Sequence, residues 1–127
     1  MVRPSAKELT ERELELMHVF WQHDDVTASE ARDLLAESGI DRAYVTVANL
    51  VRILIDKKCL EITNSERPFR YRPIRTFKEI SGSFVCEMVQ RVFLGSREQL
   101  LVQLFGERRK LTKRERKLLK KVLEEQA

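Results

Sequence analysis

Four polar side chains between residues 42 and 52 could read the edges of DNA bases. They recur on one side of a helical pattern, opposite its apolar side: Arg42, Thr46, Asn49 and Arg52. Arg can hydrogen-bond O6 and N7 of guanine together, Asn can bond N6 and N7 of adenine, and a Thr methyl group can contact thymine. Because residues near the start of a recognition helix normally enter the major groove, the pattern predicts base contacts. A solvated helix face is the alternative interpretation.

Basic residues continue beyond this segment and could bind the phosphate backbone of DNA. Those predicted to contact phosphates are Lys57, Lys58, Arg67, Arg70 and Arg72. Phosphate contacts add affinity but carry no sequence information. The charge distribution favours this role, because residues 42–75 carry a net charge of +5 and residues 1–41 carry −6, within a chain of net charge +4. A charged hairpin that only aids solubility is the alternative.

The sequence supports metal-binding, redox and catalytic chemistry less than it supports DNA binding. His18 and His23 are five residues apart, not the four that align two ligands on one helix face, so no metal site is predicted. Cys59 and Cys86 are expected to be buried thiols, with a redox contact of Cys86 across a dimer as the alternative. The sequence pairs no nucleophile with a base and contains no Gly-rich phosphate loop. It therefore predicts neither an enzyme nor a bound cofactor.

The elements that must position these residues follow from capping and periodicity. Capping boxes at residues 10–13 and 27–30 open two predicted helices, one over residues 11–23 and one that ends before Gly39. A third helix is predicted over residues 41–57, with Asp41 as its cap. Residues 59–63 and 69–73 read as two strands of a hairpin. The expected fold is mainly α with a small β-hairpin wing, a winged helix-turn-helix over residues 1–75.

Residues 76–127 are expected to form a three-helix dimerisation region. The predicted helices cover residues 76–94 and the segments opened by Ser96 and Thr112. Because so short a helical set rarely encloses a core alone, its apolar rows are predicted to contact a second copy. The residues assigned to this contact are Phe84, Met88, Val92, Leu118, Leu119 and Val122. Leu104 and Phe105 are expected to be buried. The basic residues at 108–110 and 113–121 are expected to form a solvated outer face of the dimer, with DNA or membrane contact as the alternative.

The order and spacing of these features resemble the BlaI/MecI/CopY family of bacterial repressors over about residues 9–125. In the first part the matching residues are Leu9-Thr10, Glu13 to Met17, Trp21, Val45-Thr46-Val47, Leu50, Arg52, Leu54, Arg67, Phe69, Tyr71 and Pro73. In the second part they are Phe93, Gly95-Ser96, Leu111, Glu115 and Leu123. The resemblance implies a homodimer whose winged helices bind operator DNA and whose C-terminal helices form the dimer contact.

Three departures from the family pattern bear on turn geometry and regulation. Lys58 stands where the family usually has Gly, so the turn after the third helix must close without a residue suited to the left-handed region. Penicillinase and methicillin repressors are cleaved at an Asn–Phe bond, and Phe105 fits that position but follows Leu104. Copper-responsive members carry a Cys-x-Cys pair near the C-terminus, whereas no cysteine follows Cys86. A sensor protease stays an open partner, and cleavage between Leu104 and Phe105 is not expected.

The sequence thus predicts a cytoplasmic, dimeric transcriptional repressor that occupies a palindromic operator. Double-stranded DNA and a second copy of the chain are the expected partners. No membrane partner is expected, because the longest stretch without a charged residue is nine residues, 43–51, and a span needs about 20. The first eight residues lack the apolar run of a signal peptide. A protein-interaction adaptor and an architectural DNA binder of low sequence preference are the alternatives.

Overall fold

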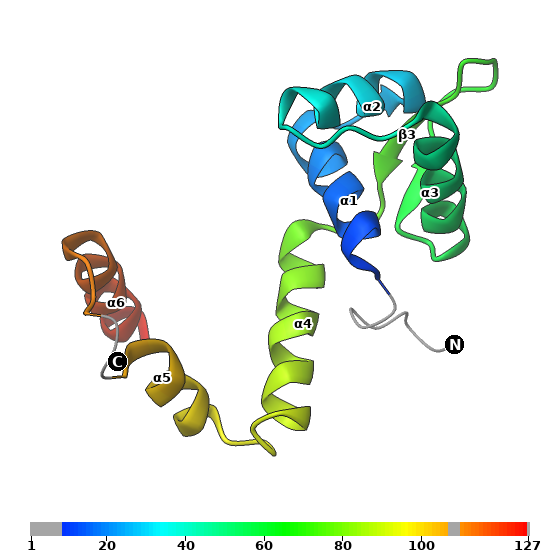
Figure 1. Cartoon of the computed structure of the whole chain (residues 1–127). Helices are drawn as coiled ribbons and strands as arrows, with labels where there is room; N and C mark the ends of the chain where they lie inside the picture. The colour runs from blue at the N-terminus through cyan, green and yellow to red at the C-terminus, as the bar shows by residue number, and fades with distance from the viewer. Residues whose placement is uncertain (1–8, 107–109, 127) are drawn as a thin grey trace. The chain divides into compact units, whose positions relative to one another are not determined.

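The computed structural model describes residues 9–106 and 110–126, and the chain divides into two compact units, Met1–Glu87 and Met88–Ala127. The described elements follow in the order α1 (Glu11–His23), β1 (Val26–Thr27), α2 (Ala28–Glu37), α3 (Tyr44–Asp56), β2 (Leu60–Ile62), β3 (Arg70–Pro73), α4 (Phe77–Arg91), α5 (Arg97–Phe105) and α6 (Lys113–Gln126) (Figure 1). The predicted fold class, mainly helical with a small β wing, is confirmed.

The first two helices begin at the capping boxes that the sequence predicts. The hydroxyl of Thr10 accepts a hydrogen bond from the backbone N–H of Glu13 at 3.2 Å, and the Glu13 side chain bonds back to the cap. Thr27 and Glu30 repeat this arrangement at the start of α2, with distances of 3.1 Å and 2.9 Å. Each box satisfies two backbone donors that a helix start would otherwise leave unpaired.

The third helix begins later than expected. Its cap residue is Ala43, which offers no side-chain hydrogen bond, so the prediction of Asp41 as the cap is wrong. The helix ends at Asp56, and Lys58 adopts a φ of +61° just beyond it. The turn therefore places a lysine in the left-handed region, as the missing glycine requires, at a cost of about 1–2 kcal/mol.

The wing is part of a three-stranded antiparallel sheet in the order β1-β3-β2, not the isolated hairpin that the sequence predicts. Strand β2 pairs with β3 through Ile62 and Tyr71, and Tyr71 also lies opposite Val26 of β1. A strand of two residues is too short to show an alternation of apolar and polar side chains, so β1 is recognised only by its pairing with β3. Strand β3 thereby joins the wing to the connection between α1 and α2.

The core of the first unit includes the first turns of α4. Phe20 and Leu16 of α1 are fully buried, and Ile80 of α4 is 1% exposed in the same cluster. The indole N–H of Trp21 donates a hydrogen bond of 2.8 Å to the carbonyl oxygen of Arg75. The compact unit thus extends to Glu87, whereas the sequence placed a boundary at residue 75.

The helices α5 and α6 of the second unit begin at the predicted caps but bury no side chain. The Ser96 hydroxyl accepts from the Gln99 N–H at 3.2 Å, and Thr112 and Glu115 form a reciprocal pair of bonds. Among the described residues, no helix is long and apolar enough to cross a membrane.

Candidate nucleic-acid interface

The exposed face of α3 carries two of the predicted base-contacting residues side by side. Val47, Val51 and Leu54 are buried, which turns Asn49 and Arg52 outward. The guanidinium of Arg52 donates a hydrogen bond of 3.2 Å to the side-chain oxygen of Asn49. The bond uses the side-chain oxygen of Asn49 and one guanidinium nitrogen of Arg52, and both residues are exposed, so their other donors can reach a base edge.

The other two predicted base-contacting residues, Arg42 and Thr46, are less exposed. Thr46 is half-buried at the edge of the exposed face. Arg42 precedes the first residue of α3, and its guanidinium forms an ion pair of 3.1 Å with Glu15 of α1. Its Nε is buried and has no hydrogen-bond partner in the structure. The sequence placed Arg42 on the recognition helix, whereas the late start of the helix leaves this side chain against α1.

Val45 is the residue on this face that the sequence reasoning missed. It is 68% exposed and lies one turn before Asn49 and two turns before Arg52. Its place four residues before Asn49 puts it on the same helix face, and this spacing could have identified it. Its apolar side chain instead suggests a position in the core. An exposed apolar group here can contact the methyl group of thymine.

The two lysines that follow α3 differ in their surroundings. Lys57 forms an ion pair with Glu13 of α1, whose side chain is only 3% exposed. Burial acts to raise the pKa of Glu13, but hydrogen bonds from Lys57 and Thr10 outweigh it and hold the pKa below its ordinary value. Lys58 is exposed. The structure therefore places Lys57 in a contact between two helices and Lys58 at the surface.

The three wing arginines are also distinct. Arg67 is exposed near the tip of the wing, with its guanidinium 5.6 Å from the centre of the Phe69 ring. Arg72 pairs with Glu61 across the hairpin at 2.6 Å, and this hydrogen bond and charge raise the pKa of Arg72. Arg70 contacts Asp25 and Glu30 beside the start of α2. Arg70 and Arg72 would therefore have to leave a carboxylate to reach a phosphate, whereas the contact described for Arg67 is with an aromatic ring.

A cavity of about 480 Å³ lies between the wing and the starts of α2 and α3. Its walls are formed by residues 27–29, by Tyr44 and by wing residues that include Arg67 and Tyr71, and none of the lining residues is acidic. Desolvation raises the pKa of Tyr71, whose phenol is protonated at neutral pH even at its ordinary value and can donate a hydrogen bond. The start of α3 and the wing thus border one concave surface that carries positive charge.

The residues assigned to dimerisation are mostly exposed within the single chain. Their exposed fractions are 43% for Met88, 69% for Val92, 63% for Leu118 and 44% for Val122, and Leu119 is half-buried. Phe84 differs, because it packs against the core of the first unit one turn after Ile80. Its assignment to a dimer contact stays a prediction, and part of this side chain already lies against the core of the single chain.

Three further expectations about exposure can be compared with the structure. Cys59 is buried, as predicted, whereas Cys86 is exposed on α4, so its prediction as a buried thiol is wrong. Leu104 and Phe105 are 54% and 41% exposed, so their predicted burial is wrong as well. Both residues belong to helix α5, in which no side chain is buried. The absence of Asn before Phe105 is then the remaining reason not to expect cleavage there.

Comparison with known proteins matches residues 9–125 to the family model described as Penicillinase repressor. The solved structure described as the complex structure of hsRosR-SG has 12% identity and a TM-score of 0.54, and the match covers 97% of this chain and 96% of that one. The structure of MepR, a transcription regulator of the Staphylococcus aureus multidrug efflux pump MepA, has 20% identity and a TM-score of 0.46, covering 94% and 78%. No curated protein matches the sequence. The structural likenesses concern the fold alone.

Proposed function

The chain belongs to the penicillinase repressor family, and from this membership we propose that it acts as a homodimeric repressor on a palindromic operator. Membership makes it a DNA-binding transcriptional regulator. The proposal adds the oligomeric state and the symmetry of the DNA site. A two-fold symmetric dimer presents two recognition helices, and such dimers bind half-sites whose centres are about one helical turn apart.

The outward pair Asn49 and Arg52 on α3 is the observation that carries the proposal. Both side chains have the hydrogen-bonding groups that distinguish bases in the major groove, and the core of the winged helix holds their backbone in place. Arg67 on the wing and Lys58 after α3 are exposed and can add phosphate contacts on either side of the groove. Base readout by α3 and backbone binding by these two residues together account for specific binding.

Support for a dimer comes from apolar side chains that the described part of one chain leaves exposed. Val92 is 69% exposed, and Leu118 and Leu123 of α6 are 63% and 62% exposed. Exposed apolar side chains of this kind favour association, because removing them from water contributes about 25 cal/mol per Å². A second copy offers the same surface, and joining two winged helices raises operator affinity through effective concentration.

The decisive experiment selects bound fragments from a random duplex pool and then measures affinity at fixed salt. We expect the selected sequences to contain an inverted repeat and the protein to bind it as a dimer. The intact repeat should bind far more tightly than one half-site or a random duplex. Equal affinity for all duplexes would indicate an architectural binder instead, and absence of duplex binding would indicate a protein-interaction adaptor.

A further inference from the structure

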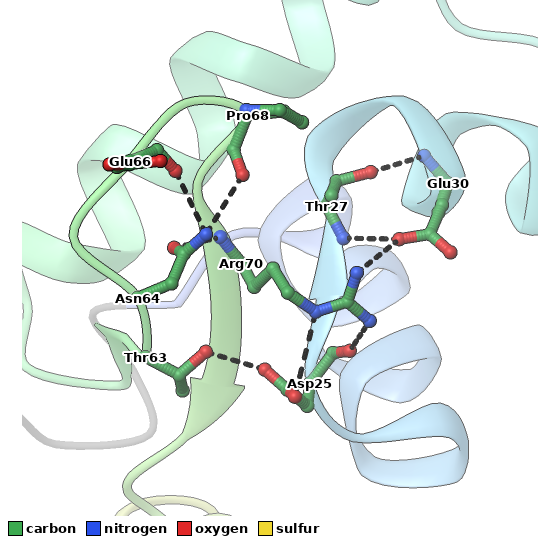
Figure 2. A network of polar contacts seen from close by, with 8 residues as sticks. All are labelled: Asp25, Thr27, Glu30, Thr63, Asn64, Glu66, Pro68 and Arg70. Atoms are coloured by element: carbon green, nitrogen blue, oxygen red, sulfur yellow. Dashed lines mark hydrogen bonds and ion pairs between the residues drawn. The ribbon is translucent and has the colours of Figure 1, made fainter.

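Arg70, at the start of β3, is surrounded by groups from the connection between α1 and α2. Its Nη2 donates a hydrogen bond of 2.6 Å to the carbonyl oxygen of Asp25, and its Nε lies 3.5 Å from the carboxylate of the same residue. Its Nη1 lies 3.5 Å from the carboxylate of Glu30. Figure 2 shows the guanidinium between these two acids. All three guanidinium nitrogens therefore contact protein groups.

Asp25 also contacts the other strand of the wing. The hydroxyl of Thr63, just after β2, donates a hydrogen bond of 2.5 Å to the Asp25 carboxylate. One carboxylate thus connects the two strands of the hairpin to the α1–α2 connection, as Figure 2 shows. We call the contacts among Asp25, Glu30, Thr63 and Arg70 the wing latch.

The backbone at the latch is held in an unfavourable conformation. Asp24 and Asp25 have φ values of +43° and +34°, in the region that favours glycine. Such conformations cost about 1–3 kcal/mol each and persist where surrounding contacts determine them. The bonds from Arg70 and Thr63 to Asp25 are contacts of this kind. The strained connection and the wing are therefore mutually dependent.

The latch lies at the base of the loop that carries Arg67. Within this loop the side-chain amide of Asn64 donates to the carbonyl oxygens of Glu66 and Pro68, at 2.9 Å and 3.1 Å. Its oxygen accepts from the backbone N–H of Arg70 at 2.8 Å (Figure 2). The tip of the wing is thus joined through Asn64 to the residue that the latch holds.

We propose that Arg70 is a positioning residue for DNA binding, fixing the wing through Asp25 and Glu30 so that Arg67 meets the phosphate backbone. This inference rests on the proposed function. The competing role is a direct phosphate contact by Arg70, as the sequence predicts. The two roles differ in what Asp25 does. In a direct contact its carboxylate competes with phosphate, whereas in the latch it supports DNA binding.

The two roles predict opposite changes in DNA affinity for one substitution, Asp25→Asn. Ordinary electrostatics predicts that Asp25→Asn tightens DNA binding, because it removes a negative charge near a phosphate-binding wing. The latch predicts that it weakens binding, by at least about threefold, a modest coupling for residues in contact. Glu66→Gln is the matched control, because it removes an exposed wing acid that lies outside the latch. This control should bind as tightly as the unaltered protein or more tightly.

Arg70 itself gives two further tests in the full chain. Arg70→Lys keeps the positive charge, but an ammonium group cannot contact Asp25 and Glu30 together as the planar guanidinium does. The latch therefore predicts that Arg70→Lys loses nearly as much DNA affinity as Arg70→Ala. The dependence of log affinity on log salt should keep its slope in both variants. Arg67→Ala, which removes a phosphate contact, should reduce that slope by about one. The double variant of Asp25→Asn with Arg70→Ala should lose little more than either single variant.

Binding is measured on a mixed-sequence duplex of about 30 base pairs at several salt concentrations, with thermal unfolding as the check that each variant folds. Thr63→Val, which removes only one hydrogen bond, carries the test if an Arg70 variant does not fold. It should weaken binding without changing the salt slope. Tighter binding by Asp25→Asn, recovery by Arg70→Lys, or a lower slope in Arg70→Ala would overturn the latch alone. Absence of binding by the unaltered protein to this duplex and to any duplex selected from a random pool would overturn the proposed function as well.

Discussion

The carboxylate of Glu13, in the first turn of α1, accepts a hydrogen bond from the ammonium group of Lys57, the residue that directly follows α3. A second carboxylate of α1, that of Glu15, pairs with Arg42 just before α3 begins, at 3.1 Å. The recognition helix is therefore tied to α1 near both of its ends. Two residues that the sequence assigns to DNA contact, Arg42 and Lys57, thus connect α1 to the two ends of the helix that carries Asn49 and Arg52.

Glu13→Gln should destabilise the fold in a pH-dependent way. The pKa of Glu13 is lowered on folding, so its contribution is present above the unfolded pKa of about 4.3 and is lost as pH falls through the lower folded value. At pH 7 the variant should lose about 1–3 kcal/mol, because the half-buried ammonium group of Lys57 loses its charged partner. Urea unfolding at a series of pH values measures this difference.

The difference between the unaltered protein and Glu13→Gln should shrink as the pH is lowered below about 4.3. Glu11→Gln is the control, since Glu11 lies in the same helical turn but is exposed, and it should cost less than about 1 kcal/mol. A stability difference that stays constant from pH 7 to pH 3 would contradict the charged contact between Glu13 and Lys57.

Asn49→Ala and Arg52→Ala should each reduce binding to a selected operator by about 1–3 kcal/mol. Their combined loss should fall short of the sum, because the two side chains share a hydrogen bond of 3.2 Å. Binding to random duplex should change much less for Asn49→Ala. Gln22→Ala, on the exposed side of α1, is the control and should leave both affinities unchanged. An equal loss on random duplex would show that Asn49 does not read a base.

Ile80→Ala should cost about 2–5 kcal/mol of unfolding free energy, because Ile80 is 1% exposed in the winged-helix core. Val85→Ala, five residues later on the same helix, should cost less than about 0.5 kcal/mol since that side chain is 50% exposed. Chemical denaturation of the full chain measures both. Similar small losses in the two variants would mean that the winged helix ends before α4, as a boundary at residue 75 implies.

Val122→Asp should convert the proposed dimer into a monomer and reduce operator affinity at least about tenfold, because a buried charge without a partner opposes association. Val122 is 44% exposed on α6 in the single chain, so the substitution should leave the monomer folded. Val122→Leu is the matched control and should remain dimeric. Sedimentation gives the oligomeric state directly. A dimer that persists in Val122→Asp would place the contact between copies away from this face of α6.

The local features of this fold could be read from the sequence. The boxes at Thr10 and Thr27 connect residues three positions apart, so their hydrogen bonds depend on local chain geometry alone. The burial of Val47, Val51 and Leu54 follows in the same way from helical periodicity. These short-range patterns were enough to order the elements of a winged helix, to turn Asn49 and Arg52 outward and to reveal the family.

The tertiary structure decided which charged side chains are available to DNA. Arg70 and Asp25 are 45 residues apart in the chain, and Lys57 and Glu13 are 44 apart. No periodicity links such residues, so the sequence showed basic side chains without the carboxylates that hold them. The pairing of β1 with β3 and the burial of Ile80 are also contacts between parts of the chain that are distant in sequence. Each depends on how separate elements pack, because contacts between distant residues form only when the chain brings those elements together.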